Sequence, residues 1–415
     1  MDYFQYKDDT LFAENVALTE IAKQFGTPCY VYSKAAIVNS WRTFDESFGS
    51  HPHKICYAVK ANSNLAILNI LAKLGSGFDI VSQGELERVL IAGGDPQKIV
   101  FSGVGKSETE INRALEANIF CFDIESLDEL DRLQTLAKNK NCIAQIALRI
   151  NPNIDAKTHP YIATGLEENK FGIDINDALP LCKHIKNLSH VKLIGLACHI
   201  GSQLTDLEPF IEAIDSLLKL VDRLAEDDMT LKYINFGGGL GVRYQNETPP
   251  AIHEYIYALV NKIQKYKLEV VIEPGRAIVA SAGILLTKVE YLKHNKNKNF
   301  AIVDAGMNDL LRPALYNAWQ HIVPVNQNKH ADNKLYDIVG PVCESGDFLG
   351  KDRQLNLTSG DLIAVLTSGA YGFTMSSNYN SRPRAVELLV DGDKIHVIRQ
   401  RETIQDLFAK EHIPT

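Results

Sequence analysis

The sequence lacks concentrated positive charge and long apolar stretches. Lysine and arginine number 43 against 51 aspartate and glutamate residues, the formal net charge is −8, and no basic arm or arginine-rich stripe occurs. Because nucleic-acid-binding proteins gather basic residues in one segment or on one face, we expect no nucleic-acid partner. No apolar run approaches the length of a membrane span, and residues 1–9 are polar and acidic rather than signal-like. We therefore expect no membrane association.

The sequence also lacks the cysteine and histidine patterns of disulfide frameworks and metal sites. Its seven cysteines are scattered, odd in number and without a C-x-x-C pair. This usage predicts reduced thiols, packed as small hydrophobic groups in a protein of the cytoplasm. His51 and His53 can chelate a metal in principle, but no third ligand lies near them in the sequence. We interpret both as surface residues and predict no metal site.

What the sequence does contain is a regular alternation of short apolar runs and amphipathic helical patterns. Continuous apolar strands that alternate with helices predict a parallel sheet covered on both faces. Eight such units in succession predict an α/β fold with a (β/α)8 TIM-type barrel. The eight runs lie at residues 55–59, 78–81, 99–101, 119–124, 143–150, 193–198, 233–236 and 270–272.

Helical patterns between these runs carry start signals. Four of them cover residues 65–74, 85–92, 107–117 and 126–137. Ser107 with Glu110, and Ser126 with Glu129, have the spacing of a capping box, in which a serine and an acid three residues later satisfy the free N–H groups of the first turn.

After residue 277 the pattern changes to β-rich runs separated by turns. They lie at residues 284–289, 300–303, 322–325, 362–366, 385–390 and 394–398. We predict a barrel domain over residues 34–277 and a C-terminal all-β domain over residues 278–415. The segment 1–33, with a strand-like stretch at residues 29–32, is expected to join the β domain. No Gly/Ser/Pro-rich linker separates the two.

Reactive side chains follow the predicted strands. Lys60 ends the first run; it is either a solvated surface charge or an amine in a desolvated pocket, where its pKa falls and it can form a Schiff base. In a barrel of this type the carboxyl ends of the strands meet on one face. We therefore expect Lys60 to lie near the other strand-end residues, which are Asp79, Ser82, Arg149, His199, Gly237–Gly241, Glu273 and Arg276.

Each of these features has a second interpretation. Gly237–Gly241 is either an ordinary loop that needs positive φ angles or a set of bare N–H groups that cradle a phosphate. His199 is either a satisfied core residue or a ring that stacks on a planar cofactor. Glu273 is either an ion-pair partner of Arg276 or the partner of a protonated ring nitrogen. The segment Gly103–Ser107 looks like the end of a nucleotide-binding P-loop, but that motif requires glycine where Val100 stands, so we interpret the segment as an ordinary loop.

A lysine, a phosphate cradle, a stacking imidazole and an acid for a ring nitrogen together indicate pyridoxal 5′-phosphate. The chain resembles the diaminopimelate decarboxylases, pyridoxal-phosphate enzymes with an alanine-racemase-like barrel and a C-terminal β domain. The resemblance rests on residues 57–62, 78–85, 101–106, 149–161, 169–173, 199–203, 237–241, 273–276, 304–307, 311–313, 343–347 and 369–372.

The resemblance implies a role for each matching residue. Lys60 carries the cofactor and His199 stacks on its ring, while Glu273 contacts the pyridine nitrogen and Cys343 donates a proton. The remaining cofactor contacts would be Asp79, Ser202, Gly237, Gly238, Gly239, Gly275, Arg276 and Tyr371. The substrate contacts would be Arg276, Arg312, Tyr316, Glu344 and Tyr371. Arg312 and Tyr316 are four residues apart, so on a helical turn they share one face and suit a carboxylate.

The resemblance implies decarboxylation of meso-2,6-diaminopimelate to L-lysine and carbon dioxide, the last step of lysine biosynthesis, by a cytoplasmic homodimer with shared active sites. One alternative is a decarboxylase of ornithine, arginine or lysine, or a racemase, on the same fold. Glu273 argues against a racemase, and Glu344 stands where the amine-forming decarboxylases carry aspartate. The other alternative is an inactive homologue that binds pyridoxal phosphate, which the intact Lys60 and Cys343 disfavour.

Overall fold

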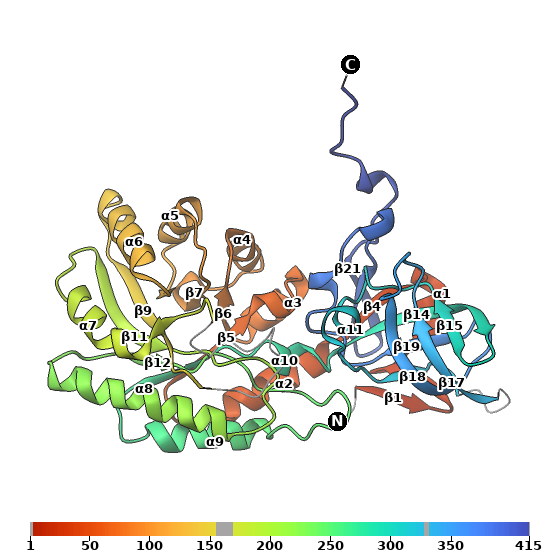
Figure 1. Ribbon diagram of the computed structural model, residues 1–415, viewed down its shortest axis with the longest axis horizontal. Coiled ribbons are helices and arrows are strands. Elements are labelled where there is room, and N and C mark those ends of the chain that lie inside the picture. Colours follow the sequence, from red (N-terminus) through yellow and green to blue (C-terminus); the bar gives the residue numbers. More distant parts are fainter. Residues whose placement is uncertain (1–2, 155–168, 328–331, 415) are drawn as a thin grey trace. The chain divides into compact units, whose positions relative to one another are not determined.

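The computed structural model describes residues 3–154, 169–327 and 332–414, so the part of the resemblance at residues 155–161 lies outside the described residues. The chain forms two compact units (Figure 1). The barrel unit comprises residues 40–242 and 248–277, and the β unit comprises residues 1–39, 243–247 and 278–415. Within the described residues, no helix is both long enough and apolar enough to cross a membrane.

The barrel unit is built on a closed ring of eight parallel strands. Each strand is hydrogen-bonded to the next, and the ring closes where β13 pairs with β5 and β8 pairs with β9. All eight apolar runs form strands, which confirms the predicted barrel. The strands are β5 (His53–Ala58), β6 (Gly77–Ile80), β7 (Ile99–Phe101), β8 (Cys121–Ile124), β9 (Ala144–Asn151), β11 (Val191–Ala197), β12 (Tyr233–Asn235) and β13 (Glu269–Ile272).

Side chains from these strands form a buried core cluster. It takes residues from seven of the eight strands, among them Cys56, Cys121, Ala147, Tyr233 and Val271. Its largest member, Tyr233, is fully buried, and its hydroxyl donates to the Cys121 thiol at 3.0 Å. The strands are thus joined by a packed core rather than by a channel.

The helices of the barrel unit follow the strands in the predicted order. They are α3 (Leu65–Lys73), α4 (Gln83–Ile91), α5 (Glu108–Ala117), α6 (Leu127–Asn139), α7 (Ile175–Ile185), α8 (Glu208–Glu226), α9 (Ile252–Ile263) and the single turn α10 (Arg276–Val279), which begins in the barrel unit and ends in the β unit. α4, α5 and α6 are neighbours along the outside of the ring (Figure 1). On the same unit α8 packs against α9, where the rings of Phe210 and Tyr255 lie 4.8 Å apart.

One predicted capping box forms and the other does not. At α5 the N–H of Glu110 donates to the Ser107 hydroxyl at 3.3 Å, and the N–H of Ser107 donates to the Glu110 carboxylate at 2.9 Å. At α6 the Ser126 hydroxyl accepts from the N–H of Glu129 at 3.2 Å. The Glu129 carboxylate, however, accepts from the N–H of Glu125 and from a buried lysine, so the second capping box was predicted wrongly.

The β unit contains a nine-stranded mixed sheet. Its main path runs β18-β17-β15-β14-β4-β20-β21, with β19 on β14 and β16 on β19. The near-N-terminal strand β4 (Cys29–Ser33) is antiparallel to β14 and parallel to β20. The others are β14 (Gly283–His294), β15 (Asn299–Val303), β16 (Ile322–Pro324), β17 (Asn333–Val339), β18 (Phe348–Asn356), β19 (Leu362–Val365), β20 (Val386–Asp391) and β21 (Lys394–Arg399).

The six predicted C-terminal strands are all present. Two further strands, β17 and β18, are not among the predicted runs. β18 lies at the edge of the sheet and carries Lys351, Asp352 and Arg353 in its middle, so it has no apolar run. The unit also contains a small sheet of β1 (Phe4–Lys7), β2 (Thr10–Ala13) and β3 (Val16–Ala17), and the helices α1 (Leu18–Phe25) and α11 (Arg312–Tyr316). α2 (Lys34–Ser47) begins in this unit and continues in the barrel unit.

Candidate active site

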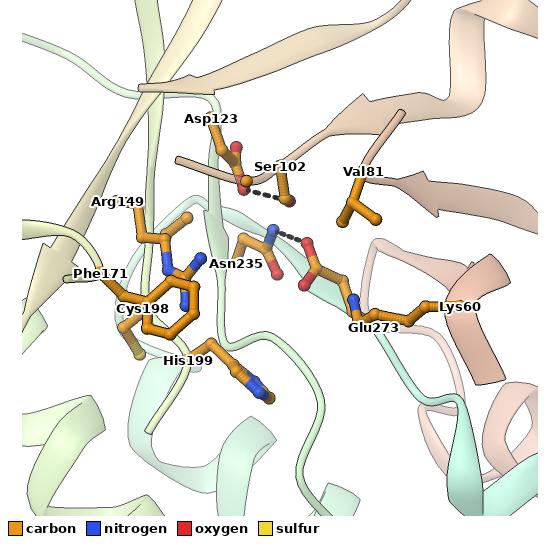
Figure 2. A pocket seen from close by; sticks show the side chains of 12 residues that line it. Lys60, Val81, Ser102, Asp123, Arg149, Phe171, Cys198, His199, Asn235 and Glu273 are labelled. Atoms are coloured by element: carbon orange, nitrogen blue, oxygen red, sulfur yellow. Dashed lines mark hydrogen bonds between the residues drawn. The ribbon is translucent and has the colours of Figure 1, made fainter. Parts of the chain in front are cut away.

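A pocket lies at the carboxyl ends of the barrel strands, and Figure 2 shows the side chains directed into it. Every residue that lines it belongs to the barrel unit. The lining residues are Lys60, Val81, Ser102, Gly103, Asp123, Arg149, Phe171, Ala197, Cys198, His199, Asn235 and Glu273. The pocket therefore combines four of the predicted strand-end residues: Lys60, Arg149, His199 and Glu273.

Lys60 enters the pocket from a single 3-10 turn, Val59–Ala61, that directly follows β5. Its Nζ binds the Oδ2 atom of Asp79, the third residue of the neighbouring strand β6. The Asp79 side chain is fully buried, whereas that of Lys60 is 39% exposed. Lys60 is therefore neither a fully solvated surface charge nor an amine in a fully desolvated pocket, because a buried carboxylate binds its partly exposed side chain.

Glu273 follows β13 and is buried among other acids. Burial, and next the carboxylates of Asp79 and Asp123, raise the pKa of Glu273 well above its ordinary value. Lys60 and a hydrogen bond from Asn235 act in the opposite direction. Burial likewise raises the pKa of Asp123 to about 7. The pocket thus holds more acid than its cations neutralise, which favours a ligand that brings positive charge.

His199 is an uncharged ring in this pocket. Burial, and next the positive charges of Arg149 and Lys60, lower the pKa of His199 well below its ordinary value. Its Nδ1 atom accepts a hydrogen bond from the backbone N–H of Gly238 at 3.3 Å. Because Nδ1 accepts, the neutral ring carries its proton on Nε2. An uncharged imidazole is suited to stack on a flat ring.

Backbone geometry explains the glycines after β12. Gly237 and Gly239 have φ angles of +63° and +120°, which favour glycine. A Cβ at Gly238 would lie 2.3 Å from the carbonyl oxygen of Glu273. The N–H of Gly237 donates to the Asn235 side chain at 2.9 Å, and the N–H of Gly238 donates to His199. The loop thus needs positive φ angles, as expected of an ordinary loop. Two of its N–H groups donate hydrogen bonds to side chains of the protein.

Ser202 and Arg276 meet next to this loop. The Nη2 atom of Arg276 donates to the Ser202 hydroxyl at 3.0 Å, and Arg276 is only 7% exposed. Arg276 begins α10, directly after Gly275. A Cβ at Gly275 would meet the side chains of Ala58 and Ala61 at 3.0 Å, so the chain approaches the Lys60 turn closely here. A buried guanidinium beside a hydroxyl can bind an anionic group.

The predicted substrate residues Arg312 and Tyr316 lie in the β unit. They are the first and last residues of α11, which confirms the predicted helical turn. The Arg312 guanidinium is buried and lies 4.5 Å from the centre of the Tyr244 ring, in the same unit. The ring face holds the guanidinium in one orientation.

Cys343 and Glu344 lie in an exposed loop of the β unit between β17 and β18. The Tyr379 hydroxyl donates to the Glu344 carboxylate. Buried Asp347 anchors the loop, because its carboxylate accepts from the N–H groups of Met307 and Val342, both at 2.6 Å. The loop is therefore fixed at its base while the Cys343 thiol faces solvent.

Tyr371 has a φ angle of +56°, which is uncommon for a residue with a side chain. A Cβ at the neighbouring Gly369 would lie 1.9 Å from a backbone carbonyl oxygen of Val279, and one at Gly372 would lie 2.4 Å from that of Ser368. The tight packing of both flanking glycines holds the backbone in this conformation. Such strained positions occur at functional sites.

Several pocket residues were not predicted as site residues: Ser102, Asp123, Phe171 and Asn235. Asp123 stands inside an apolar run, and so does Asn235, which lies two residues before a glycine. The segment that resembles a P-loop is structural. The Nζ of Lys106 is buried and donates to the carbonyl oxygens of Gly103 (2.8 Å) and Asp123 (2.7 Å) and to Glu129 (2.6 Å). Among the described residues, no group of three His, Cys, Asp or Glu side chains is placed to hold a metal ion.

Comparison with known proteins gives the chain a family. The pyridoxal-dependent decarboxylases, through their pyridoxal binding domain, match residues 34–280. The diaminopimelate decarboxylase of Haemophilus influenzae is 56% identical over 412 residues, which are 99% of both chains. That of Vibrio cholerae is 57% identical over 415 residues, covering 100% of this chain and 99% of the relative. The chain belongs to the diaminopimelate decarboxylase family.

A solved structure agrees with this assignment. Diaminopimelate decarboxylase of M. jannaschii, in co-complex with L-lysine, superimposes with a TM-score of 0.95 at 39% identity, over 100% of this chain and 98% of that one. As a member of the diaminopimelate decarboxylase family, the protein is a pyridoxal-phosphate-dependent lyase. All seven of its cysteines are free, and five of them are buried.

The residues of the pocket fit pyridoxal phosphate. Lys60 supplies an amine, and His199 supplies a neutral ring. Within the part of the chain that the structure describes, the buried Oδ1 atoms of Asp79 and Asp123 have no hydrogen-bond partner. Together with Glu273 they give the pocket the acidic character that a protonated pyridine ring compensates.

Proposed function

We propose that this protein decarboxylates meso-2,6-diaminopimelate to L-lysine and carbon dioxide, the last step of lysine biosynthesis. The observation that carries the proposal is the 56–57% identity to diaminopimelate decarboxylases across the whole chain. The pocket supports it, because a lysine, a neutral histidine and a buried acid converge where barrel enzymes act.

Bound pyridoxal phosphate supplies the electron sink for the charge that departing carbon dioxide leaves on the substrate carbon. Lys60 would hold the cofactor through its Nζ atom, and Asp79 would orient this amine through the ion pair between them. Glu273 would accept a hydrogen bond from the protonated ring nitrogen, and His199 would stack on the ring. Ser202, the glycine loop and Arg276 would hold the phosphate group.

The β unit supplies the groups for the substrate. Arg312 and Tyr316 bind its distal carboxylate, because a guanidinium fork and a phenol match a carboxylate in geometry and charge. Glu344 binds the distal ammonium group, and Tyr371 completes the contacts. Cys343 delivers a proton from Sγ to the substrate carbon after carbon dioxide leaves. The exposed thiol on a loop anchored by Asp347 supports this role.

The experiment is an assay of carbon dioxide release by the purified, cofactor-loaded protein with diaminopimelate, lysine, ornithine and arginine as separate substrates. Release from diaminopimelate, at least tenfold above the others, is the expected result. Lys60→Ala should abolish it, and Lys73→Ala, at the exposed end of α3, is the matched control that should retain it. Equal release from ornithine would refute the substrate assignment.

We also propose a homodimer in which each active site takes residues from both chains. The exposed position of Cys343 and Glu344 supports this, since a second chain can reach them. The test mixes Lys60→Ala and Cys343→Ala proteins after dissociation. Under random pairing half of the dimers are mixed, and each mixed dimer has one intact site, so up to roughly a quarter of the wild-type activity should return. No recovery would mean that each site is contained in one chain.

Two further proposals concern location and domain limits. The free thiols support a cytoplasmic protein, because reducing compartments keep cysteines unpaired. We also propose that residues 34–277 form one folding domain and that residues 278–415 form the other together with residues 1–33. Limited proteolysis followed by mass spectrometry should yield a fragment that ends near residue 277. Cleavage that leaves only fragments with other ends would contradict these limits.

A further inference from the structure

Asn235 occupies a central position that the proposed chemistry does not use. It is the last residue of β12, is fully buried and lines the pocket next to Glu273 (Figure 2). Its side chain reaches both neighbours. The Oδ1 atom accepts from the N–H of Gly237 at 2.9 Å, and the Nδ2 atom donates to Glu273 Oε1 at 2.5 Å.

The orientation of this amide follows from its partners. The backbone N–H of Gly237 can only donate, so the oxygen of the Asn235 side chain must face it. The NH2 group must then face Glu273, and the Oε1 atom of Glu273 must accept. Asn235 therefore favours the ionised form of Glu273, the form that pairs with a protonated ring nitrogen.

A third hydrogen bond closes the arrangement. The backbone N–H of Glu273 donates to the carbonyl oxygen of Gly237 at 2.7 Å. Asn235, Gly237 and Glu273 thus form a closed ring of three hydrogen bonds that joins the ends of β12 and β13. Any shift of the acid relative to the glycine loop must break at least one of them.

We propose that Asn235 is a positioning residue, which fixes the Glu273 carboxylate and the start of the glycine loop as one unit. The inference rests on the proposed function of Glu273 as partner of the ring nitrogen. It adds that the ring-nitrogen partner and the phosphate-binding loop cannot move independently, because one side chain holds both. Asn235 acts through these neighbours and contacts no reacting atom.

Two variants separate the two contacts. Asn235→Ser keeps a hydroxyl that can accept from the N–H two residues on but cannot reach Glu273, so it removes only the second contact. Asn235→Leu has a similar size and removes both. The matched control is Asn151→Ser. Asn151 ends β9 and accepts from the N–H of Asn153 at 3.0 Å, but its Nδ2 atom donates to the carbonyl oxygen of Phe171 instead of an acid.

The test measures two properties of the full-length protein besides its activity. Equilibrium dialysis gives the dissociation constant of pyridoxal phosphate, and the nitrogen-15 resonance of ring-labelled cofactor reports protonation of the ring nitrogen. For Asn235→Ser we expect about tenfold weaker binding, the effect of one hydrogen bond to a charged group, and a less protonated nitrogen. For Asn235→Leu we expect a further loss of roughly fivefold or more, because the N–H of Gly237 stays buried without an acceptor.

The control separates positioning from general destabilisation. Asn151→Ser should lower the melting temperature but leave the nitrogen resonance at its wild-type position. A wild-type resonance and affinity in Asn235→Ser would overturn the inference while leaving the proposed function intact. An unprotonated ring nitrogen in the wild-type protein would overturn both, because Glu273 would then lack its proposed role. Asn235→Ser alone decides the question if Asn235→Leu does not fold.

Discussion

Replacing Asp123 by asparagine should stabilise the cofactor-free protein at neutral pH. Burial raises the pKa of Asp123 from its ordinary value of 3.8 to about 7. Between these two values the folded protein keeps a proton that the unfolded chain has lost. Stability must therefore fall as pH rises through this window, and it recovers as pH falls. The ionised Asp123 carboxylate lowers the free energy of unfolding by its full amount only above pH 7.

The size of the effect follows from the pKa difference. Each pH unit in the window corresponds to about 1.4 kcal/mol, so the whole difference corresponds to roughly 4 kcal/mol. Asparagine has the same shape, keeps an oxygen for the Ser102 hydroxyl, which lies 3.3 Å away, and has no charge to lose. Near pH 4 the two proteins should have similar free energies of unfolding. The gap should widen to as much as roughly 4 kcal/mol by pH 8 in favour of the variant.

Urea unfolding of both proteins at pH 5, 6, 7 and 8, followed by circular dichroism, measures this gap. The slope of free energy against urea should match between proteins, so that a change in midpoint reports stability. Asp131→Asn, in an exposed position of α6, is the matched control and should run parallel to the wild type. Curves for Asp123→Asn and wild type that stay parallel across the whole range would refute the reasoning about buried acid.

Three further outcomes are expected. Gly238→Ala should lower the melting temperature by several degrees and weaken cofactor binding, because its Cβ would lie 2.3 Å from a backbone oxygen; differential scanning calorimetry and dialysis measure both, and unchanged values contradict the close packing. Arg312→Ala should weaken the binding of diaminopimelate by about 2–4 kcal/mol, which steady-state kinetics would show as a higher KM; an unchanged KM is the contrary result. Asp347→Ala should destabilise the protein by about 2–4 kcal/mol, since two N–H groups lose their acceptor; an unchanged urea midpoint would contradict it.

The barrel was predictable because its strands are buried on both faces and therefore read as continuous apolar runs. The run at residues 99–101 coincides with β7 (Ile99–Phe101). β18 could not be found in this way. It is an edge strand of a partly exposed sheet, Lys351 and Asp352 in its middle are exposed, and only its pairing with β17 defines it.

The site was predictable where a polar residue ends an apolar run, as at Lys60 and Glu273. Its electrostatics were not predictable, because they depend on register. Asp79 binds Lys60 only because Ala58 of β5 pairs with Asp79 of β6. Asp123 has no local signature within its strand. Asn235 has a weak one, an asparagine two residues before glycine, which is typical of a turn and gives no hint of Glu273.

The central claim is that Lys60 holds pyridoxal phosphate in the barrel pocket. Borohydride treatment of the loaded protein makes the bond between cofactor and lysine permanent, and peptide mapping by mass spectrometry then locates it. The label should lie on Lys60 alone, and the protein should lose its yellow colour and its activity together. A label on another lysine, or no label on a protein that still releases carbon dioxide from diaminopimelate, would contradict the account.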